Sequence, residues 1–227
     1  MKKTIKNAFI STIPVLTGYL VLGFGFGIIL KSSGYGILLA LIMSLFIYAG
    51  SMQYVAVGLL TSGASWIVAA FTTLMVNARH LFYGISMLDR YKGTGKRKPY
   101  LIFALTDETY SLLCNENQKI EEEQKKNYYF FVSLFNHVYW VLGSVIGALI
   151  GTIVNFNTEG IDFALTALFI TIFVEQWLSS KKHFPAIIGV CVSVICLIIF
   201  GSEKFLIPTM IIILLLLGLY KEENNDW

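Results

Sequence analysis

Polar and charged side chains occur at helical spacing within the third long apolar stretch of the chain. One helical face carries Thr73, Asn77, His80 and Gly84, and Arg79 lies beside it. A charge deep in a bilayer is costly unless the side chain pairs, faces water or reaches the interface. Arg79 and the polar groups around it are therefore candidates for a functional site.

Arg79 has the chemistry to bind a carboxylate, because a planar guanidinium group can form two parallel hydrogen bonds with one carboxylate. It could bind a substrate carboxylate, with Asn77 as an amide donor beside it. Alternatively, it could pair with Asp107 or Glu108 across the fold. Snorkelling is the simplest alternative, because Leu88 ends the apolar stretch nine residues later.

Two neighbouring carboxylates form a second candidate site. Asp107 and Glu108 lie in a short apolar segment, where carboxylates could bind an ammonium group or a cation, or accept a proton. Together with His80, they are candidate proton carriers. The alternative is a helix N-terminus at the membrane surface, with Thr106 as its cap and the two acids favoured by the helix dipole.

His80 has an alternative of its own, since a contact within its helix would explain this histidine equally well. The sequence shows no second histidine at the spacing of a metal ligand. We therefore expect no metal site, no catalytic residue and no cofactor.

The first apolar stretch contains Pro14 and a cluster of glycines that includes Gly23, Gly25 and Gly27. Such residues permit local unwinding of a helix, and the freed main chain could line a cavity. Gly23 and Gly25 are therefore candidate substrate-binding positions. Gly23 and Gly27 also have the spacing of a close helix contact, and the two interpretations are compatible.

Small and polar residues recur in the second and fourth apolar stretches. Gln53 is the candidate ligand contact of the second stretch, whereas Ser44 and Ser51 are better explained by hydrogen bonds between helices. In the fourth stretch, the four-residue glycine spacing predicts tight helix packing. Its glycines are Gly143, Gly147 and Gly151. Their partner could be a helix of this chain or of a second subunit.

The elements that carry these residues are predicted to be membrane-spanning helices. Only 14% of the 227 residues are charged, against about one quarter in soluble domains. A backbone in lipid must satisfy its own hydrogen bonds, which predicts an all-α, polytopic membrane protein with about seven long helices in one domain, residues 1–227. The expected spans are Phe9–Leu30, Ile37–Leu60, Trp66–Leu88, Tyr128–Val154, Phe163–Leu178, Ala186–Phe200 and Phe205–Leu219. Tyr100–Cys114 is too short to span and is predicted to be re-entrant or a half-helix.

The basic residues create a conflict in this topology. Lys2, Lys3 and Lys6, the Arg90–Lys98 loop, and Lys181 and Lys182 should all be cytoplasmic, as should the C-terminal tail. Three long segments separate the first two basic stretches, so either one segment fails to cross or the Arg90–Lys98 loop is extracellular. The net charge of +3 is explained by membrane orientation rather than by nucleic-acid binding.

Six segments occur in this order along the chain: Gly18–Gly27, Ala49–Gln53, Asn77–His80, Leu105–Glu108, Trp140–Ser144 and Asp162–Phe169. Together they resemble the AzlC family of large subunits of branched-chain amino acid exporters. The resemblance implies export of valine, leucine and isoleucine type substrates across a bacterial cytoplasmic membrane. It also implies a small membrane partner of AzlD type, encoded as a separate chain.

The chain carries no GxxxxGK[ST] phosphate loop, so proton-coupled or gradient-driven transport is more natural than ATP hydrolysis by this chain.

Two other function classes have less support in the sequence than transport. An intramembrane enzyme would need acid–base or metal chemistry, but HExxH and GxSxG motifs are absent from the sequence. In a non-transporting membrane scaffold, the glycine repeats would matter and the charged residues would be dispensable.

Overall fold

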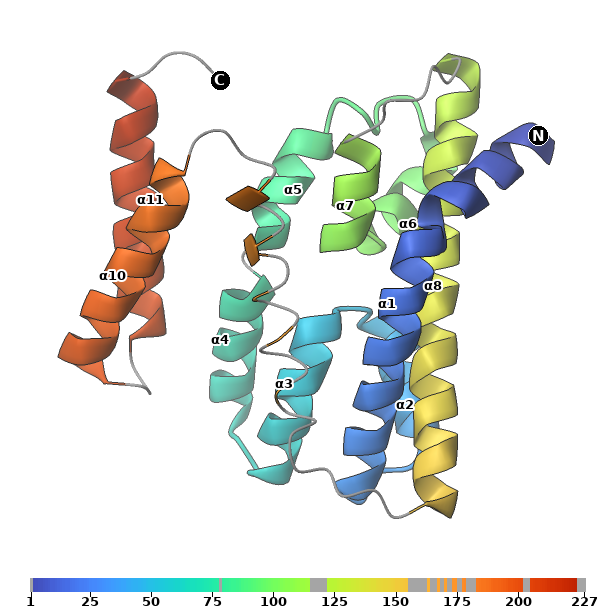
Figure 1. The fold of residues 1–227 in the computed structure, drawn as a ribbon, viewed down its shortest axis with the longest axis horizontal. Helices are drawn as coiled ribbons and strands as arrows, with labels where there is room; N and C mark the ends of the chain where they lie inside the picture. Colours follow the sequence, from blue (N-terminus) through green and yellow to red (C-terminus); the bar gives the residue numbers. More distant parts are fainter. Residues whose placement is uncertain are drawn as a thin grey trace. The chain divides into compact units, whose positions relative to one another are not determined.

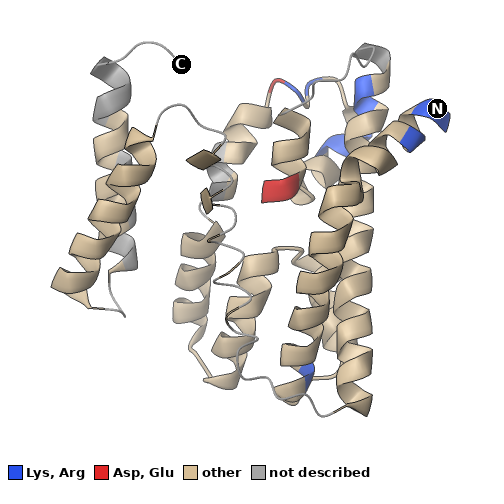
Figure 2. Ribbon diagram, in the orientation of Figure 1, with Lys and Arg blue, Asp and Glu red and all other residues tan. Residues whose placement is uncertain are grey.

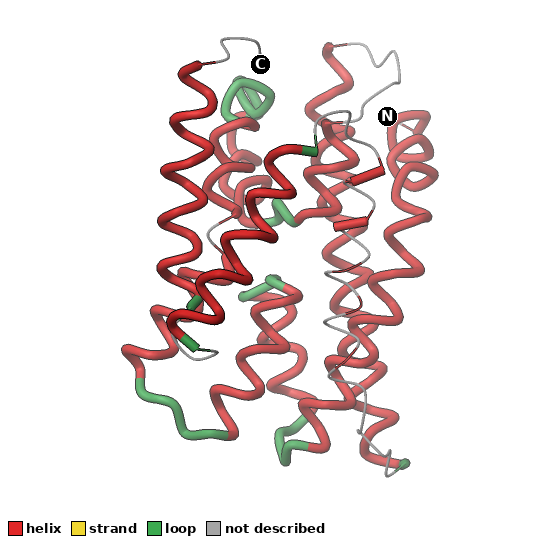
Figure 3. Tube along the Cα trace, turned by 60° about the vertical axis from the view of Figure 1, so that its left-hand side comes forward, coloured by secondary structure: helices red, strands yellow, loops and turns green. Residues whose placement is uncertain are grey.

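The computed structural model describes residues 2–77, 79–114, 122–154, 183–201 and 205–223, with a few isolated residues between 163 and 178. All described elements are helical, which confirms the prediction of an all-α fold for this part of the chain (Figure 3). The chain divides into two compact units, Met1–Leu165 and Thr166–Trp227. The side chain of Arg79 and most of the predicted Phe163–Leu178 span lie outside the described residues.

The first unit holds all the elements that carry the candidate site. In chain order they are α1 (Lys2–Ser32), α2 (Ile37–Phe46), α3 (Gly50–Thr61), α4 (Trp66–Asn77), α5 (Arg79–Met87), a short 3-10 helix (Gly95–Arg97), α6 (Lys98–Phe103), α7 (Asp107–Cys114) and α8 (Glu122–Ile153). In the second unit, α10 (Phe184–Phe200) packs against α11 (Leu206–Glu223).

Among the described residues of the first unit, two helices are long and apolar enough to cross a membrane. They are α1 and residues Gln124–Ile153 of α8. The two lie side by side along their length (Figure 1). The predicted number of about seven long helices is not confirmed, because several predicted spans are divided or shorter than a bilayer requires.

The predicted single span Ile37–Leu60 is wrong, because α2 and α3 form a hairpin that enters and leaves at the same end of the unit (Figure 1). Its turn lies at the middle of α8, where Trp140 Nε1 donates a 2.8 Å hydrogen bond to Gln53 Oε1. Further along α3, Val57 packs in one cluster with Leu30 near the end of α1.

A second hairpin, α6–α7, enters from the opposite end (Figure 1). Its outer end lies near the start of α8, where Arg97 Nη1 donates a 2.5 Å hydrogen bond to Asn127 Oδ1. Its turn lies at mid-length, where Asn136 of α8 donates a 3.0 Å hydrogen bond to Thr109 Oγ1. The expected short element in this region is therefore a pair of helices.

The predicted span Trp66–Leu88 is also divided, into α4 and α5. These two helices follow one another from one end of the unit to the other (Figure 1). Between the N-terminus and the Arg90–Lys98 loop, α1 and the α4–α5 pair therefore extend from one end of the unit to the other, whereas the α2–α3 hairpin returns to the end at which it began. Lys and Arg residues accordingly gather at the end that holds the N-terminus, with Lys31 at the other end (Figure 2). The hairpin thus removes the conflict in the positive-inside pattern.

This topology predicts the side on which two exposed positions lie. We expect Ser62→Cys, at the α3–α4 turn, to react with an impermeant maleimide added to intact cells, and Lys96→Cys to react only in inverted vesicles. Both variants are made in a background in which Cys114, Cys191 and Cys196 are replaced by alanine. A single crossing by Ile37–Leu60 would give the reverse labelling pattern.

Candidate functional site

A cavity of about 490 Å³ lies where the three divided segments meet. The lining comes from the α2–α3 turn, the α4–α5 break, the remainder of α5 with the turn that follows it, and the α6–α7 hairpin. The lining residues are Ile47, Tyr48, Ala49, Asn77, His80, Gly84, Ile85, Leu88, Tyr91, Lys98, Ile102, Phe103 and Leu105. Most of them are apolar, and the few polar groups include Asn77 and His80, which were predicted from the sequence.

Helix breaks supply main-chain polar groups to this region. The last carbonyls of one helix and the first N–H groups of the next have no partner within their own helix. Such backbone is tolerated at membrane depth only where it is buried in protein or lines a cavity. At the α2–α3 turn, Tyr48 adopts a left-handed backbone conformation with φ of +45°, which is rare for a bulky residue.

Three lining side chains carry buried polar atoms without a hydrogen-bond partner among the described residues. They are Tyr48, through its hydroxyl, Asn77, through Oδ1, and Tyr91, through its hydroxyl. Burial raises the pKa of the Tyr91 phenol above its ordinary value, so this group stays protonated and can donate. Because buried polar groups are nearly always paired, these three atoms around one cavity are available to a polar ligand or to water.

A half-buried carboxylate, Glu108, lies beside the α6–α7 turn. The Tyr19 hydroxyl of α1 donates a 2.6 Å hydrogen bond to Glu108 Oε2 and lies 2.7 Å from Thr106 Oγ1. Thr106 Oγ1 in turn accepts a hydrogen bond from the Thr109 backbone N–H, which caps the start of α7. This is the helix N-terminus that the sequence offered as an alternative, but it lies against the middle of α1 rather than at the end of the unit.

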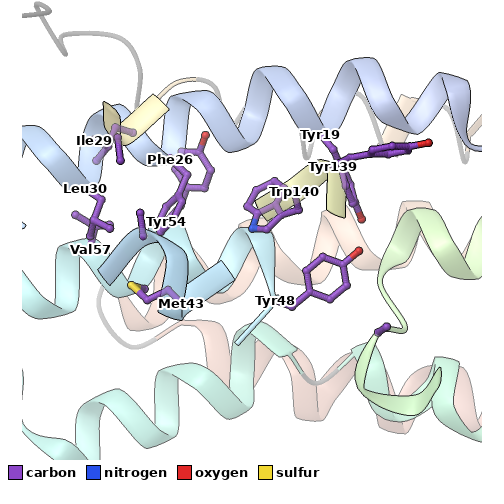
Figure 4. Packing of buried hydrophobic residues seen from close by; sticks show 13 residues of the cluster. Tyr19, Phe26, Ile29, Leu30, Met43, Tyr48, Tyr54, Val57, Tyr139 and Trp140 are labelled. Atoms are coloured by element: carbon purple, nitrogen blue, oxygen red, sulfur yellow. The ribbon is translucent and has the colours of Figure 1, made fainter. Parts of the chain in front are cut away.

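Gln53 lies outside the cavity, in a buried polar network. Its Oε1 accepts from Trp140 Nε1, and its Nε2 donates to Ser44 Oγ at 3.2 Å. Both ends of the Gln53 amide are thus bound within the protein. Trp140 also belongs to one buried hydrophobic cluster with Tyr19 and Tyr48 (Figure 4).

The glycines of the first and fourth predicted spans face one another. A Cβ at Gly23 would lie 3.0 Å from the backbone N of Ser144 and the backbone O of Trp140. Gly143 and Gly147 face the backbone of α1 in the same way. The packing partner is therefore a helix of this chain. Neither Gly23 nor the half-buried Gly25 lines the cavity.

A Cβ at Gly151 would meet the side chain of Lys31 at 3.2 Å, which extends the same contact toward the end of α1.

Arg79 is the first residue of α5 and lies in the sequence between Asn77 and His80, which both line the cavity. His80 Nδ1 lies 3.2 Å from the backbone O of Asn77, and its ring packs edge-on against Tyr83. Asp107 begins α7 and is half-buried.

Tyr19 and Tyr91 were missed from the sequence. A tyrosine within an apolar stretch gives no local signal of whether its hydroxyl is paired, so only its surroundings reveal the role.

Comparison with known proteins gives a consistent family. The AzlC protein family matches residues 14–154. The chain is 50% identical over 210 residues to the branched-chain amino acid transport protein AzlC of Bacillus subtilis, covering 92% of this chain and 82% of that protein. It is 44% identical over 221 residues to an uncharacterized membrane protein of Helicobacter pylori, covering 97% and 96%. Inner membrane protein YgaZ of Escherichia coli is 27% identical over 205 residues, covering 88% and 82%. None of the solved structures matches the chain.

Proposed function

The chain belongs to the AzlC family of membrane transport proteins, and we propose that it exports branched-chain amino acids of the valine, leucine and isoleucine class. The proposal places it in the bacterial cytoplasmic membrane with a cytoplasmic C-terminus and a small AzlD-type membrane subunit as its partner. It is supported by the 50% identity to a branched-chain amino acid transport protein.

The cavity at the helix breaks is the proposed substrate site. Its volume of about 490 Å³ falls within the range of small-molecule pockets, about 300–1,000 Å³. The apolar lining suits a branched aliphatic side chain. The unpartnered polar atoms of Tyr48 and Asn77 suit the charged end of an amino acid. The single observation that carries the proposal is this meeting of buried, unpartnered polar atoms with an otherwise apolar wall.

Charged groups near the cavity receive roles in this proposal. Arg79 binds the substrate carboxylate with Asn77 beside it, while His80, Asp107 and Glu108 are the proton carriers that couple export to a proton gradient. Helix ends are suited to such sites, because their N-termini favour anions and their C-termini favour cations.

In this proposal Gly23 serves the contact between α1 and α8 and Gln53 serves the buried hydrogen-bond network, so neither binds substrate, and Gly25 has no assigned role.

Export of labelled amino acids tests the proposal. Cells that express this chain with its small subunit are expected to release labelled valine, leucine and isoleucine faster than cells that lack it, and to resist toxic leucine analogues. Efflux unchanged by the chain, with and without the small subunit, would remove the exporter assignment.

A matched pair of glycine variants locates the site. Gly84 lines the cavity and Gly58 of α3 does not, and a Cβ at either glycine meets no heavy atom within 4 Å. Gly84→Leu should fill the cavity and reduce efflux at least tenfold, whereas Gly58→Leu should leave it unchanged. Equal efflux by the two variants would place the substrate site elsewhere. If the protein were a non-transporting membrane scaffold, neither substitution would change the function of the protein.

A further inference from the structure

We propose that Tyr48 couples the substrate cavity to the half-buried Glu108 carboxylate, by donating its single hydroxyl hydrogen bond either to the bound amino acid or to the Tyr19–Glu108 pair. This inference rests on the proposed function. It adds a substrate-contacting residue and a reason for binding to depend on proton concentration.

The position of Tyr48 is fixed from several sides. It forms the α2–α3 turn with φ of +45°, and its ring centroid lies 4.3 Å from that of His137 and 6.2 Å from that of Phe103. Only 3% of the residue is exposed. A left-handed conformation at a bulky residue persists only where its surroundings hold it, and such strain is typical of functional sites.

Tyr48 adjoins two polar regions, the cavity and the Tyr19–Glu108 pair. Tyr48 lines the cavity, and its side chain extends from the hairpin turn toward Tyr19 of α1 (Figure 4). It lies within electrostatic range of Glu108 and near the hydroxyls of Tyr19 and Thr106. It nevertheless forms no hydrogen bond of normal geometry with any described residue. Rotation of the hydroxyl about its C–O bond, with the ring held in place, could therefore direct this donor to either region.

The chemistry of a phenol makes the two partners exclusive. A tyrosine hydroxyl has one proton to donate. An ionised Glu108 competes strongly for donors in its network, because hydrogen bonds to charged acceptors are the stronger ones. A protonated Glu108 competes weakly and leaves the Tyr48 donor to the carboxylate of the substrate. Protonation of Glu108 and substrate binding should therefore favour one another by the same factor.

Other titratable groups surround this pair and set the background of the experiment. Those that face Glu108 or Tyr48, or share the cavity, are Tyr19 of α1, His80 of α5, Tyr91 of the turn after α5, Lys98 and Tyr100 of α6, Asp107 of α7 and His137 of α8. Arg79 begins α5 beside His80, and its side chain lies outside the described residues. Variants that change only one hydroxyl or one carboxyl group are therefore needed.

The test measures leucine binding and proton uptake by the purified full chain with its small subunit, in nanodiscs across pH 5–9. Wild-type protein should take up protons as it binds leucine, and its affinity should fall as pH rises. Tyr48→Phe keeps the ring and removes the donor, so leucine affinity at low pH should fall about tenfold or more and proton uptake should largely disappear. Glu108→Gln should bind leucine without proton uptake and with little pH dependence.

Tyr54→Phe is the matched control. The Tyr54 hydroxyl donates a 2.6 Å hydrogen bond to the backbone O of Leu22, and Tyr54 does not line the cavity. This variant should retain wild-type affinity and proton uptake.

If Tyr48→Phe binds leucine with wild-type affinity and wild-type proton uptake, the inference is overturned. If Tyr48→Phe does not fold, Glu108→Gln decides the test, and an unchanged pH dependence of leucine binding in that variant overturns the inference. If wild-type protein binds no branched-chain amino acid, the proposed function itself fails.

Discussion

Gly147→Leu is expected to leave little or no folded protein. Gly147 of α8 lies against the backbone of α1, and a Cβ at this position would lie 2.7 Å from the Cα of Phe24 and closer still to its carbonyl oxygen. Backbone atoms cannot rotate away as a side chain can, so α1 and α8 would have to separate. These two helices form the most extensively packed pair of the first unit, and the α2–α3 and α6–α7 hairpins each contact one of them.

The expected loss of stability exceeds that of ordinary overpacking. Extra methylenes in a packed core typically cost about 1–3 kcal/mol. Here the obstruction is backbone against backbone, so we expect a larger effect, measured as the yield of monodisperse protein and its thermal midpoint in detergent.

Gly18→Leu is the matched control, because Gly18 is also a glycine of this helix pair and a Cβ there meets nothing within 4 Å. It should fold normally. Wild-type yield and midpoint in Gly147→Leu would show that the close contact of α1 and α8 is dispensable.

Arg79→Ala is expected to abolish nearly all export while leaving folded protein in the membrane. Arg79 begins α5 between Asn77 and His80, which both line the cavity. A zwitterionic substrate brings a carboxylate into a region of low dielectric, where an arginine can hold it through two parallel hydrogen bonds. Arg79→Lys keeps the charge and loses the planar fork, so it should retain part of the activity. Asn77→Ala should weaken apparent substrate affinity.

Protein level and substrate binding, measured separately, distinguish the roles of Arg79. If it pairs structurally with Asp107 or Glu108, Arg79→Ala should lower the amount of folded protein, and neutralising the correct acid should restore it. Arg97→Ala is the control, because Arg97 is an exposed arginine at the end of the unit. An abundant Arg79→Ala protein with normal binding and export would leave snorkelling as the explanation.

The sequence by itself determined that this protein consists of helices in a membrane, and it identified the polar residues that are candidates for a functional role. Apolar length and low charge are local properties, so they predicted helices and a membrane without any knowledge of contacts. The glycine spacing around Gly147 likewise predicted a tight contact, because four-residue spacing places small residues on one helical face. Asn77 and His80 were found because an apolar stretch makes polar residues conspicuous.

Only the tertiary structure decided how the apolar stretches are used. Ile37–Leu60 has the length and hydropathy of a span, yet the chain reverses at Tyr48, which is neither glycine nor proline. That turn is held by the rings of His137 and Phe103, far away in the sequence. Tyr19 meets Glu108 across 89 residues for the same reason. Such contacts depend on which helix faces lie together, and periodicity within one helix carries no information about its neighbours.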